Sequence, residues 1–319
     1  MGDKSKISWT DATWNPVVGC TKASEGCAHC YAERDHNKRH KAFCEGKLQN
    51  VPQYSKPFNQ VQLIESRLDQ PIKWKRPRKI FVNSQSDLFH PDVQFEFIDK
   101  VFAVMAIAKQ HTFQILTKRP DRMLEYLSNE WREALIEGNM QRMLSEIHGR
   151  KVWIDNEAFF FRDLANLITM TTVENQKRAD ERLPLLIKAK DYLKNCKLGI
   201  SIEPMLGPIE LRGHKDFIIE CPVCRGSGNI GSGFHNRCPK CKGGRRIYAF
   251  DWVICGGESG SKARLMQPEW VRSLRDQCTA ADVPFFFKQW GEYRGHLDGV
   301  RMPGNVLDGQ TWQQMPEVV

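Results

Sequence analysis

The sequence TWNPVVGCTKASEGCAHCYAE, residues 13–33, contains a short apolar stretch, a loop with three cysteines and the start of a predicted helix. Cys20, Cys27 and Cys30 have the spacing C-x6-C-x2-C. An odd number of neighbouring thiols cannot pair off locally, so this loop indicates a metal centre rather than a disulfide framework. Three thiolates leave a four-iron cluster one ligand short, and the open position on that iron would bind a small molecule.

Two other interpretations of the three cysteines stay open at this point. A zinc ion would take them together with one nearby histidine, for which the candidates are His29, His36 and His40. Alternatively, the thiols are free and buried. The position of the cysteines favours the iron–sulfur cluster, because they directly follow a predicted first strand that ends near Gly19.

The order of strand, polar loop and helix recurs along the chain. Apolar runs predict strands at residues 79–84, 111–118, 151–154, 167–175, 197–204, 251–260 and 283–291, and helical spacing predicts helices at 94–109, 120–127 and 268–281. Nearly continuous apolar strands are typical of a parallel sheet that is buried on both faces. We therefore expect an α/β fold whose parallel sheet is closed or partly closed into a TIM-like (β/α) barrel.

Polar residues follow the predicted strands. In a parallel barrel the loops after the strands open on one face, where active sites form, and the three-cysteine loop occupies the first of these positions. The other residues expected on this face are Asn83, Ser84, Asp87, Glu174, Asn175, Glu203, Gly256, Gly257, Glu258, Ser259 and Lys288. For each of them, an ordinary hydrogen bond at a strand end is the alternative to a ligand contact.

A second cysteine cluster lies in a glycine-rich insertion at residues 213–250. It has the form CPVC-x13-CPKC, and its members are Cys221, Cys224, Cys238 and Cys241. Four thiolates complete the tetrahedral shell of a zinc ion and leave no open position, so this site is predicted to be structural. A redox-active set of thiols is the alternative. Because basic residues flank the cysteines, we expect the insertion to lie on the active face and to contact nucleic acid or a protein partner.

The 319-residue chain has a formal net charge of +9, which favours acidic partners, and nucleic acid first among them. Its N-terminal sequence, MGDKSKISWTD, lacks the apolar core of a secretory signal, and no apolar run is long enough to span a membrane. We therefore expect a cytoplasmic protein. In a reducing compartment, clustered cysteines among the eleven in the chain are expected to bind metals.

Several motifs taken together resemble a known family. WTDATWNPVVGC, CAHCY, VNSQSDLFH, SIEPMLGPIEL, GGESG and VPFFFKQWGE occur in this order, and the series resembles the phage-associated family named for phage gene products thirty-seven and sixty-eight. The resemblance implies a radical-SAM-type partial (β/α) barrel over residues 1–212 and 251–293. Residues 213–250 would be an inserted zinc-ribbon-like module, because CPVCRGSG and CPKCKGGRR resemble half of a DnaJ-type zinc domain. Residues 294–319 would form a tail with a small hairpin at an Asp-Gly turn.

The resemblance to this family also implies a mechanism. A [4Fe–4S] cluster on Cys20, Cys27 and Cys30 would bind S-adenosylmethionine, and an electron from a reductant protein would release a 5′-deoxyadenosyl radical. The expected substrate is a nucleic acid or a nucleotide. The usual radical-SAM motif has three residues between its first two cysteines, whereas this chain has six. The alternative is a non-catalytic zinc-binding protein of phage or mobile-element origin that binds nucleic acid or acts as an adaptor.

The resemblance gives the polar residues after the strands candidate roles as ligands of the cofactor or substrate. Asn83, Ser84 and Asp87 would hold the methionine amine or the ribose, Glu174 and Asn175 the ribose hydroxyls, Glu203 and Glu258 the sulfonium or a substrate amine, and Lys288 a carboxylate or a phosphate. Gly256, Gly257 and Gly260, which flank Glu258 and Ser259, would let the backbone approach a ligand closely.

Overall fold

A computed structural model describes residues 5–151, 159–211, 217–221, 223–230, 237–240, 242, 244, 246–293 and 304–317. Within these residues, seven strands form one parallel sheet in the order β1-β4-β5-β6-β7-β10-β11. The strands are β1 (Ala12–Trp14), β4 (Lys79–Val82), β5 (Thr112–Thr117), β6 (Leu167–Thr172), β7 (Lys197–Ile202), β10 (Trp252–Gly256) and β11 (Phe285–Gln289). The spatial order follows the chain order without reversal, as in a (β/α) barrel and unlike a doubly wound sheet. The predicted α/β fold with a partly closed barrel is confirmed.

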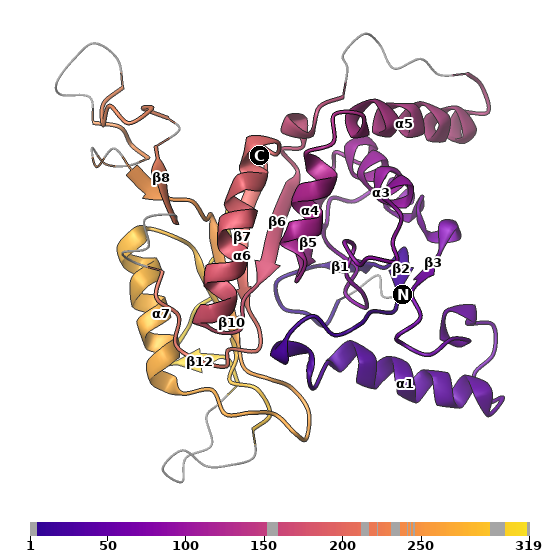
Figure 1. The fold of residues 1–319 in the computed structure, drawn as a ribbon, viewed down its shortest axis with the longest axis horizontal. Coiled ribbons are helices and arrows are strands. Elements are labelled where there is room, and N and C mark those ends of the chain that lie inside the picture. The colour runs from indigo at the N-terminus through magenta and orange to yellow at the C-terminus, as the bar shows by residue number, and fades with distance from the viewer. Residues whose placement is uncertain are drawn as a thin grey trace.

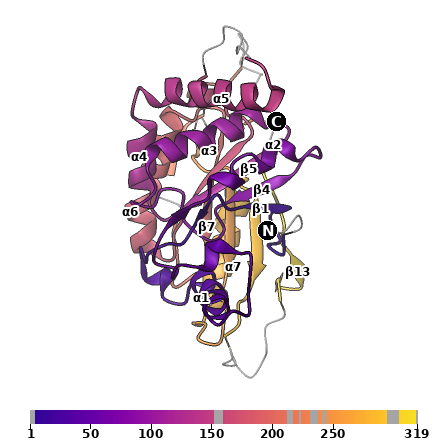
Figure 2. The same cartoon turned by 90° about the vertical axis from the view of Figure 1, so that its right-hand side faces the viewer.

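Helices connect the strands and cover the sheet (Figure 1). They are α1 (Tyr31–Cys44), α2 (Gln70–Lys73), α3 (Phe95–Ile107), α4 (Pro120–Leu127), α5 (Arg132–His148), α6 (Gln176–Lys188) and α7 (Pro268–Ala281). Helices α4 and α6 lie beside each other on one side of the sheet, and α3 packs against α5 (Figure 2). Right-handed crossovers between strands in this order place the connecting helices on one face and leave the other face concave.

Both faces of the sheet are buried. Ile80 and Val82 belong to the large core between the sheet and the helices, whereas Phe81, between them, points into a smaller cluster on the concave face. That inner cluster consists of Trp9, Phe81, Ile168, Met170, Trp252, Ile254 and Phe286. Gly199 of β7 makes room for it, because a Cβ there would lie 2.8 Å from Met170 Cγ. Two buried faces explain why the strands are continuous apolar runs rather than alternating ones.

The C-terminal tail covers the free edge of the sheet. Gln313 forms an antiparallel bridge with Phe286 of β11, and the Phe287 amide donates to the Trp312 carbonyl at 2.7 Å. The tail also contains a hairpin of β12 (Val306–Leu307) and β13 (Gln310–Thr311), joined by Asp308 and Gly309, which both have positive φ. An Asp-Gly pair suits this turn. The exposed hydrogen-bonding groups of the last strand are thereby partly satisfied.

The first strand ends earlier than the sequence predicts. We expected it to continue to Gly19, but the pairing of β1 with β4 ends at Trp14. Pro16, two residues further on, has no amide hydrogen for the ladder. Val17 and Val18 instead form β2 (Val17–Val18), which pairs antiparallel with β3 (Gln62–Leu63). The strand predicted at residues 151–154 lies mostly outside the described residues.

The cysteine-rich insertion lies at the end of the sheet away from the three-cysteine loop. Its described part contains the antiparallel pair β8 (Ile218–Glu220) and β9 (Arg246–Tyr248). Because β9 ends only a few residues before β10 begins, the pair lies at the amino end of the sheet. Figure 1 shows β8 at the top and α1, which follows the three-cysteine loop, at the bottom. The expectation that the insertion shares the active face is therefore wrong.

Candidate functional site

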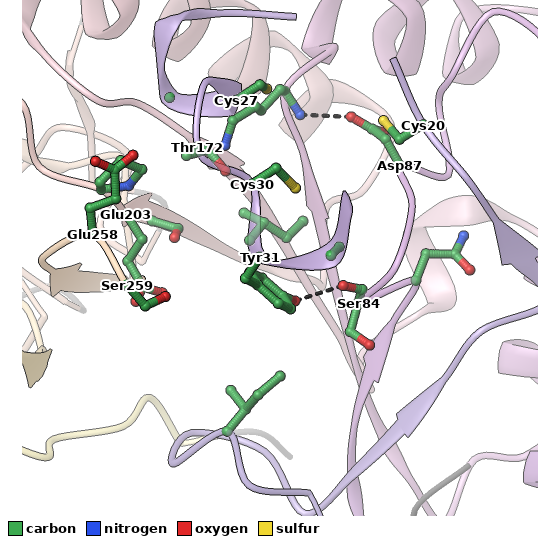
Figure 3. A pocket seen from close by; sticks show the side chains of 18 of the residues that line it. Cys20, Cys27, Cys30, Tyr31, Ser84, Asp87, Thr172, Glu203, Glu258 and Ser259 are labelled. Atoms are coloured by element: carbon green, nitrogen blue, oxygen red, sulfur yellow. Dashed lines mark hydrogen bonds between the residues drawn. The ribbon is translucent and has the colours of Figure 1, made fainter. Parts of the chain in front are cut away.

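A cavity of about 370 Å³ opens at the carboxyl ends of the strands. Its size is within the range of ligand sites in proteins, about 300–1,000 Å³. All seven strands or the loops after them contribute to its wall; representatives are Cys20, Asn83, Lys118, Thr172, Glu203, Glu258 and Lys288. Figure 3 shows the three cysteines on one side of this cavity, and Glu203, Glu258 and Ser259 on the other.

Arg119 and Asp87 hold the first cysteine of the loop. Arg119 Nη1 lies 3.7 Å from Cys20 Sγ and 3.0 Å from Asp87 Oδ2. Asp87 also accepts hydrogen bonds from the Thr117 hydroxyl at 2.7 Å and from the Lys118 amide at 3.0 Å. Burial raises the pKa of the Cys20 thiol to about 11; the Asp87 charge acts in the same direction, and Arg119 opposes both. Asp87 therefore ties the loops after β4 and β5 to Cys20.

A buried histidine holds the next residue of the loop. The Asp92 amide donates to His90 Nδ1 at 3.1 Å, so we assign the ring proton to Nε2, which lies 2.7 Å from the Thr21 hydroxyl. Arg119 Nη2 donates to the Thr21 carbonyl at 2.9 Å. From the sequence, Arg119 was expected on this face as part of Thr117–Arg119 after a strand, but no role was assigned to it, to Thr21 or to His90. The available signal was their position, since His90 and Arg119 also follow strands β4 and β5 closely.

The middle of the loop rests on Glu174, whose side chain is fully buried. The Ser24 hydroxyl donates to Glu174 Oε1 at 2.6 Å. Lys118 Nζ lies 3.3 Å from Oε1, and Arg182 Nη1 lies 3.1 Å from Oε2. Gly26 is required here, because a Cβ on it would overlap the Glu174 side chain. Glu174 thus positions the cysteine loop, and its oxygens are already shared among three donors.

Asn175 and Arg178 at the start of α6 hold Glu25 of the loop. Asn175 is the N-cap of α6: its side-chain oxygen accepts from the Arg178 amide at 3.1 Å, and its Nδ2 donates to Glu25 Oε1 at 2.6 Å. Arg178 Nη2 lies 2.7 Å from Glu25 Oε2. These hydrogen bonds, that of Arg178 foremost, lower the pKa of Glu25 to about 2. One amide side chain therefore caps a helix and fixes the loop.

Glu258 fixes the end of the loop that carries the third cysteine. Its Oε2 accepts from Arg264 Nε at 2.8 Å and lies 3.1 Å from His29 Nδ1. Arg264 Nη2 donates to the Glu25 carbonyl at 3.1 Å. Burial opposes ionisation of Glu258, but the hydrogen bonds from Arg264 outweigh it and lower the pKa to about 2. Glu258 is therefore ionised and fully engaged by the protein.

Glu203 and Lys288 form an ion pair in the opposite wall of the cavity, with Lys288 Nζ 2.8 Å from Glu203 Oε1. The glycines between their strands provide the space. A Cβ on Gly256 would lie 2.8 Å from Glu203 Oε1, and one on Gly257 would overlap the Trp290 carbonyl. Gly256 therefore leaves space for the Glu203 side chain, and Gly257 leaves space for the backbone at Trp290.

Three residues of the cavity wall, Trp9, Asn83 and Ser201, have a buried polar side-chain atom with no hydrogen-bond partner among the described residues. Asn83 has a positive φ of 61°, and its Oδ1 accepts from the Val17 amide at 3.2 Å, but its Nδ2 is unpaired. The Ser201 hydroxyl is also unpaired. Tyr31 Oη donates to the Ser84 carbonyl at 2.6 Å (Figure 3). Because unpaired buried polar groups are costly, these atoms are available to hydrogen-bond a polar ligand or water in the cavity.

The two cysteine clusters differ in how closely their sulfur atoms lie together. A tetrahedral ion with bonds of about 2.3 Å to sulfur holds its sulfur ligands about 3.8 Å apart. Among the described residues, only Cys221, Cys224 and Cys238 form a group of three metal-ligand side chains within 4.8 Å. The sulfur atoms of Cys20, Cys27 and Cys30 do not gather in this way. In this structure the three thiols of the loop are therefore not gathered around the position of a single ion.

Each histidine proposed as a fourth zinc ligand for the first loop contacts a protein oxygen through one ring nitrogen. His36 Nε2 lies 2.9 Å from the Lys56 carbonyl, and His40 Nδ1 lies 2.7 Å from the Tyr54 carbonyl. His29 contacts Glu258. A zinc-bound histidine commonly donates its other ring N–H to a carbonyl or a carboxylate, so these contacts are compatible with a histidine ligand. The zinc interpretation of Cys20, Cys27 and Cys30 stays a prediction beside the cluster.

Comparison with known proteins places the chain in a family. A family profile described as "Protein of unknown function (DUF5131)" matches residues 4–316. The chain belongs to this family. No curated protein matches it. A solved structure of a cysteine-to-serine mutant of spore photoproduct lyase matches 63% of the chain with 15% sequence identity and a TM-score of 0.38. The match covers 48% of that lyase chain, about half its length.

In this member of the family, the cavity brings together eight of the predicted cofactor-binding residues: Asn83, Ser84, Asp87, Gly257, Glu203, Glu258, Ser259 and Lys288. Glu174, Asn175 and Gly256 are outside its wall. Their predicted contact with a ligand stays a prediction, and in the structure they support the loop or make room for Glu203. No described helix combines the length and the apolar character that a membrane span needs.

The second cysteine cluster is buried and compact. Cys221 Sγ and Cys238 Sγ are 3.7 Å apart, close to the separation that a tetrahedral ion imposes. Cys224 completes a group of three thiols that can hold a metal ion. The fourth predicted ligand, Cys241, lies outside the described residues.

Proposed function

We propose that the chain is a radical S-adenosylmethionine-type iron–sulfur enzyme that modifies or repairs a nucleic acid or a nucleotide. One observation carries this proposal. Cys20, Cys27 and Cys30 lie on the loop after the first strand, line a cavity at the carboxyl ends of all seven strands, and do not all lie within 4.8 Å of one another. This arrangement suits a cluster that keeps one iron open toward the cavity.

The residues present fit the proposed groups. Cys20, Cys27 and Cys30 would hold a [4Fe–4S] cluster, and the polar wall around Asn83 and Ser84 would hold S-adenosylmethionine. Bound there, these groups would supply hydrogen-atom abstraction by a 5′-deoxyadenosyl radical, with a reductant protein as the electron source.

The chain's own residues would orient ligands and exclude water. Arg119 donates toward Cys20 and offsets the negative charge that builds up where three thiolates meet. Trp9, Phe81 and Leu116 form an apolar wall on the concave face of the sheet. Such a wall keeps water from reactive intermediates. Lys288 and Glu203 face this region from the last strands and present one cation and one anion for a polar ligand.

The test is the metal content and visible spectrum of the chain purified without oxygen. We expect about four irons with matching sulfide and about one zinc per chain, and visible absorbance that bleaches with dithionite. An iron-free, colourless chain with two zincs would overturn the proposal.

The second candidate is a non-catalytic zinc-binding protein of phage or mobile-element origin that binds nucleic acid or acts as an adaptor. The 3.7 Å separation of Cys221 and Cys238 and the net charge of +9 favour it. Both candidates share one element, which is a zinc module at residues 213–250 inserted into a barrel of residues 1–212 and 251–293.

Zinc in this module is expected to depend on Cys238. Cys238→Ser should lower zinc by about one per chain and increase proteolysis within residues 213–250, because folding of small metal modules depends on the ion. Iron should be unchanged, since the module lies at the amino end of the sheet. The measurement is elemental analysis with limited proteolysis. Cys44→Ser is the control, because Cys44 is exposed and outside the group. Zinc retained in full by Cys238→Ser would contradict the assignment.

A further inference from the structure

A second cavity, of about 330 Å³, adjoins the first. His29, Cys30, Arg34 and Ser259 line both cavities, so the two spaces meet beside the third cysteine of the loop. The second cavity lies between the start of α1 and the loop after β10. A ligand that occupies both would pass directly by Cys30.

The second cavity is lined by two cationic side chains, Arg34 and Lys262. Arg34 packs over Gly260, which has a φ of 107° and where a Cβ would overlap the Arg34 guanidinium. The ion pair of Arg34 is a 3.4 Å contact with its chain neighbour Asp35. Lys262 has no ion-pair partner within the described part of the chain. The acid in this wall, Glu33, lies 3.9 Å from Lys22.

The loop after β10 is fixed in place before any ligand binds. Glu258 and Arg264 pair across it, with Arg264 Nη2 2.5 Å from Glu258 Oε1. The Gly260 amide donates to the Glu292 carboxylate. The hydroxyls of Ser259 and Ser261 belong to this fixed loop and, like Arg34, border the cavity. Hydroxyl and cationic donors around a small concave space are the groups that bind phosphate oxygens.

We infer that the second cavity holds a phosphate group of the substrate and directs the attached nucleoside into the first cavity. The inference rests on the proposed function and specifies its substrate as a nucleotide or a single-stranded nucleic acid. The first cavity supplies what a nucleoside needs, namely an aromatic wall of Trp9 and Phe81 and the unpaired Ser201 hydroxyl. The concave shape and the direct connection between the cavities favour a narrow polyanion over the broad surface of an acidic protein.

The test is binding of a fluorescein-labelled, eight-nucleotide single-stranded DNA to the full chain, followed by fluorescence anisotropy across a salt series. The double variant Arg34→Gln/Lys262→Gln should bind at least tenfold more weakly. The slope of log K against log salt should fall by about 0.7, the contribution of one phosphate contact to a single strand. Arg34→Lys in the Lys262→Gln background should recover part of the affinity and shows that the fold is intact.

The control is Lys41→Gln/Lys47→Gln, which removes the same charge from exposed side chains near Glu45 that border neither cavity. We expect less than a twofold change. Equal losses in the two double variants, or no binding by the wild-type chain, would overturn the inference.

Iron measured on the same samples separates this inference from the proposed function. Iron present with equal losses in both double variants overturns the phosphate site alone. Iron absent with a selective loss in Arg34→Gln/Lys262→Gln overturns the radical chemistry and supports the phosphate site.

Discussion

Cys27→Ser is expected to abolish iron binding and leave zinc at about one per chain. A serine hydroxyl is a much poorer iron ligand than a thiolate, and a cluster that already has only three protein ligands would lose one of them. The zinc should persist because the Cys221–Cys238 group lies at the other end of the sheet. Iron, sulfide and zinc per chain, measured with the visible spectrum after anaerobic purification, check both expectations.

Cys27 is the most informative of the three cysteines for this test. The Ala23 amide donates to Cys27 Sγ at 3.5 Å, and a serine hydroxyl can accept the same hydrogen bond, so the loop should keep its shape. Cys44→Ser, at the exposed end of α1, is the matched control and should retain iron and zinc. A normal iron content in Cys27→Ser, with an unchanged circular dichroism spectrum, would show that Cys27 is not an iron ligand. It would contradict the proposed cluster on Cys20, Cys27 and Cys30.

The sheet was predictable because its strands are apolar on both faces. Strand β5 and helices α4 and α7 begin within about one residue of their predicted starts. Pro120 and Pro268 mark the first turns of these helices, where a missing amide hydrogen costs nothing. The end of β1 was not predictable in this way. The apolar residues after Trp14 are equally compatible with a longer strand. They pair instead with β3, whose sequence has no apolar pattern that would predict a strand.

The position of the insertion could not be read from its place in the chain. Residues 213–250 follow β7, whose carboxyl end faces the cavity, and this suggested a shared face. However, the chain must run from the carboxyl end of β7 back to the amino end of β10. An insertion can lie at any point along this connection. The described pair β8 and β9 lies at the end of the path. The local sequence determines which residues can bind the metal. The path of the connection from β7 to β10 determines where in the fold these residues lie.

The roles of the polar residues after the strands depended on contacts that are distant in sequence. Ser24 and Glu174 are 150 positions apart, and nothing in either segment shows that the cysteine loop crosses to β6. A carboxylate after a strand can bind a ligand or support a loop, and residue type alone does not separate these functions. The structure gives Glu174 the supporting role, and this assignment leads to a large expected effect.

Glu174→Gln is expected to destabilise the iron-free chain by about 3–5 kcal/mol, the cost of removing one partner from a buried ion pair. Lys118 and Arg182 would lose the carboxylate that lies 3.3 and 3.1 Å from them. A glutamine retains the size of the side chain and can still accept the hydrogen bond from Ser24. The loss of stability therefore measures the contribution of the Glu174 charge. Urea unfolding of the iron-free chain, followed by circular dichroism, measures it.

Glu25→Gln is the matched control for Glu174→Gln. Glu25 also anchors the cysteine loop, but its side chain is 36% exposed and its partner is Arg178. Exposed pairs contribute about 0–1 kcal/mol, so this variant should unfold close to the wild-type urea concentration. If Glu174 were instead available for a ribose, Glu174→Gln would leave stability unchanged and weaken binding of S-adenosylmethionine. If the two variants are equally stable, Glu174 is better interpreted as a ligand-binding residue. If only Glu174→Gln loses stability, Glu174 is the main support of the cysteine loop.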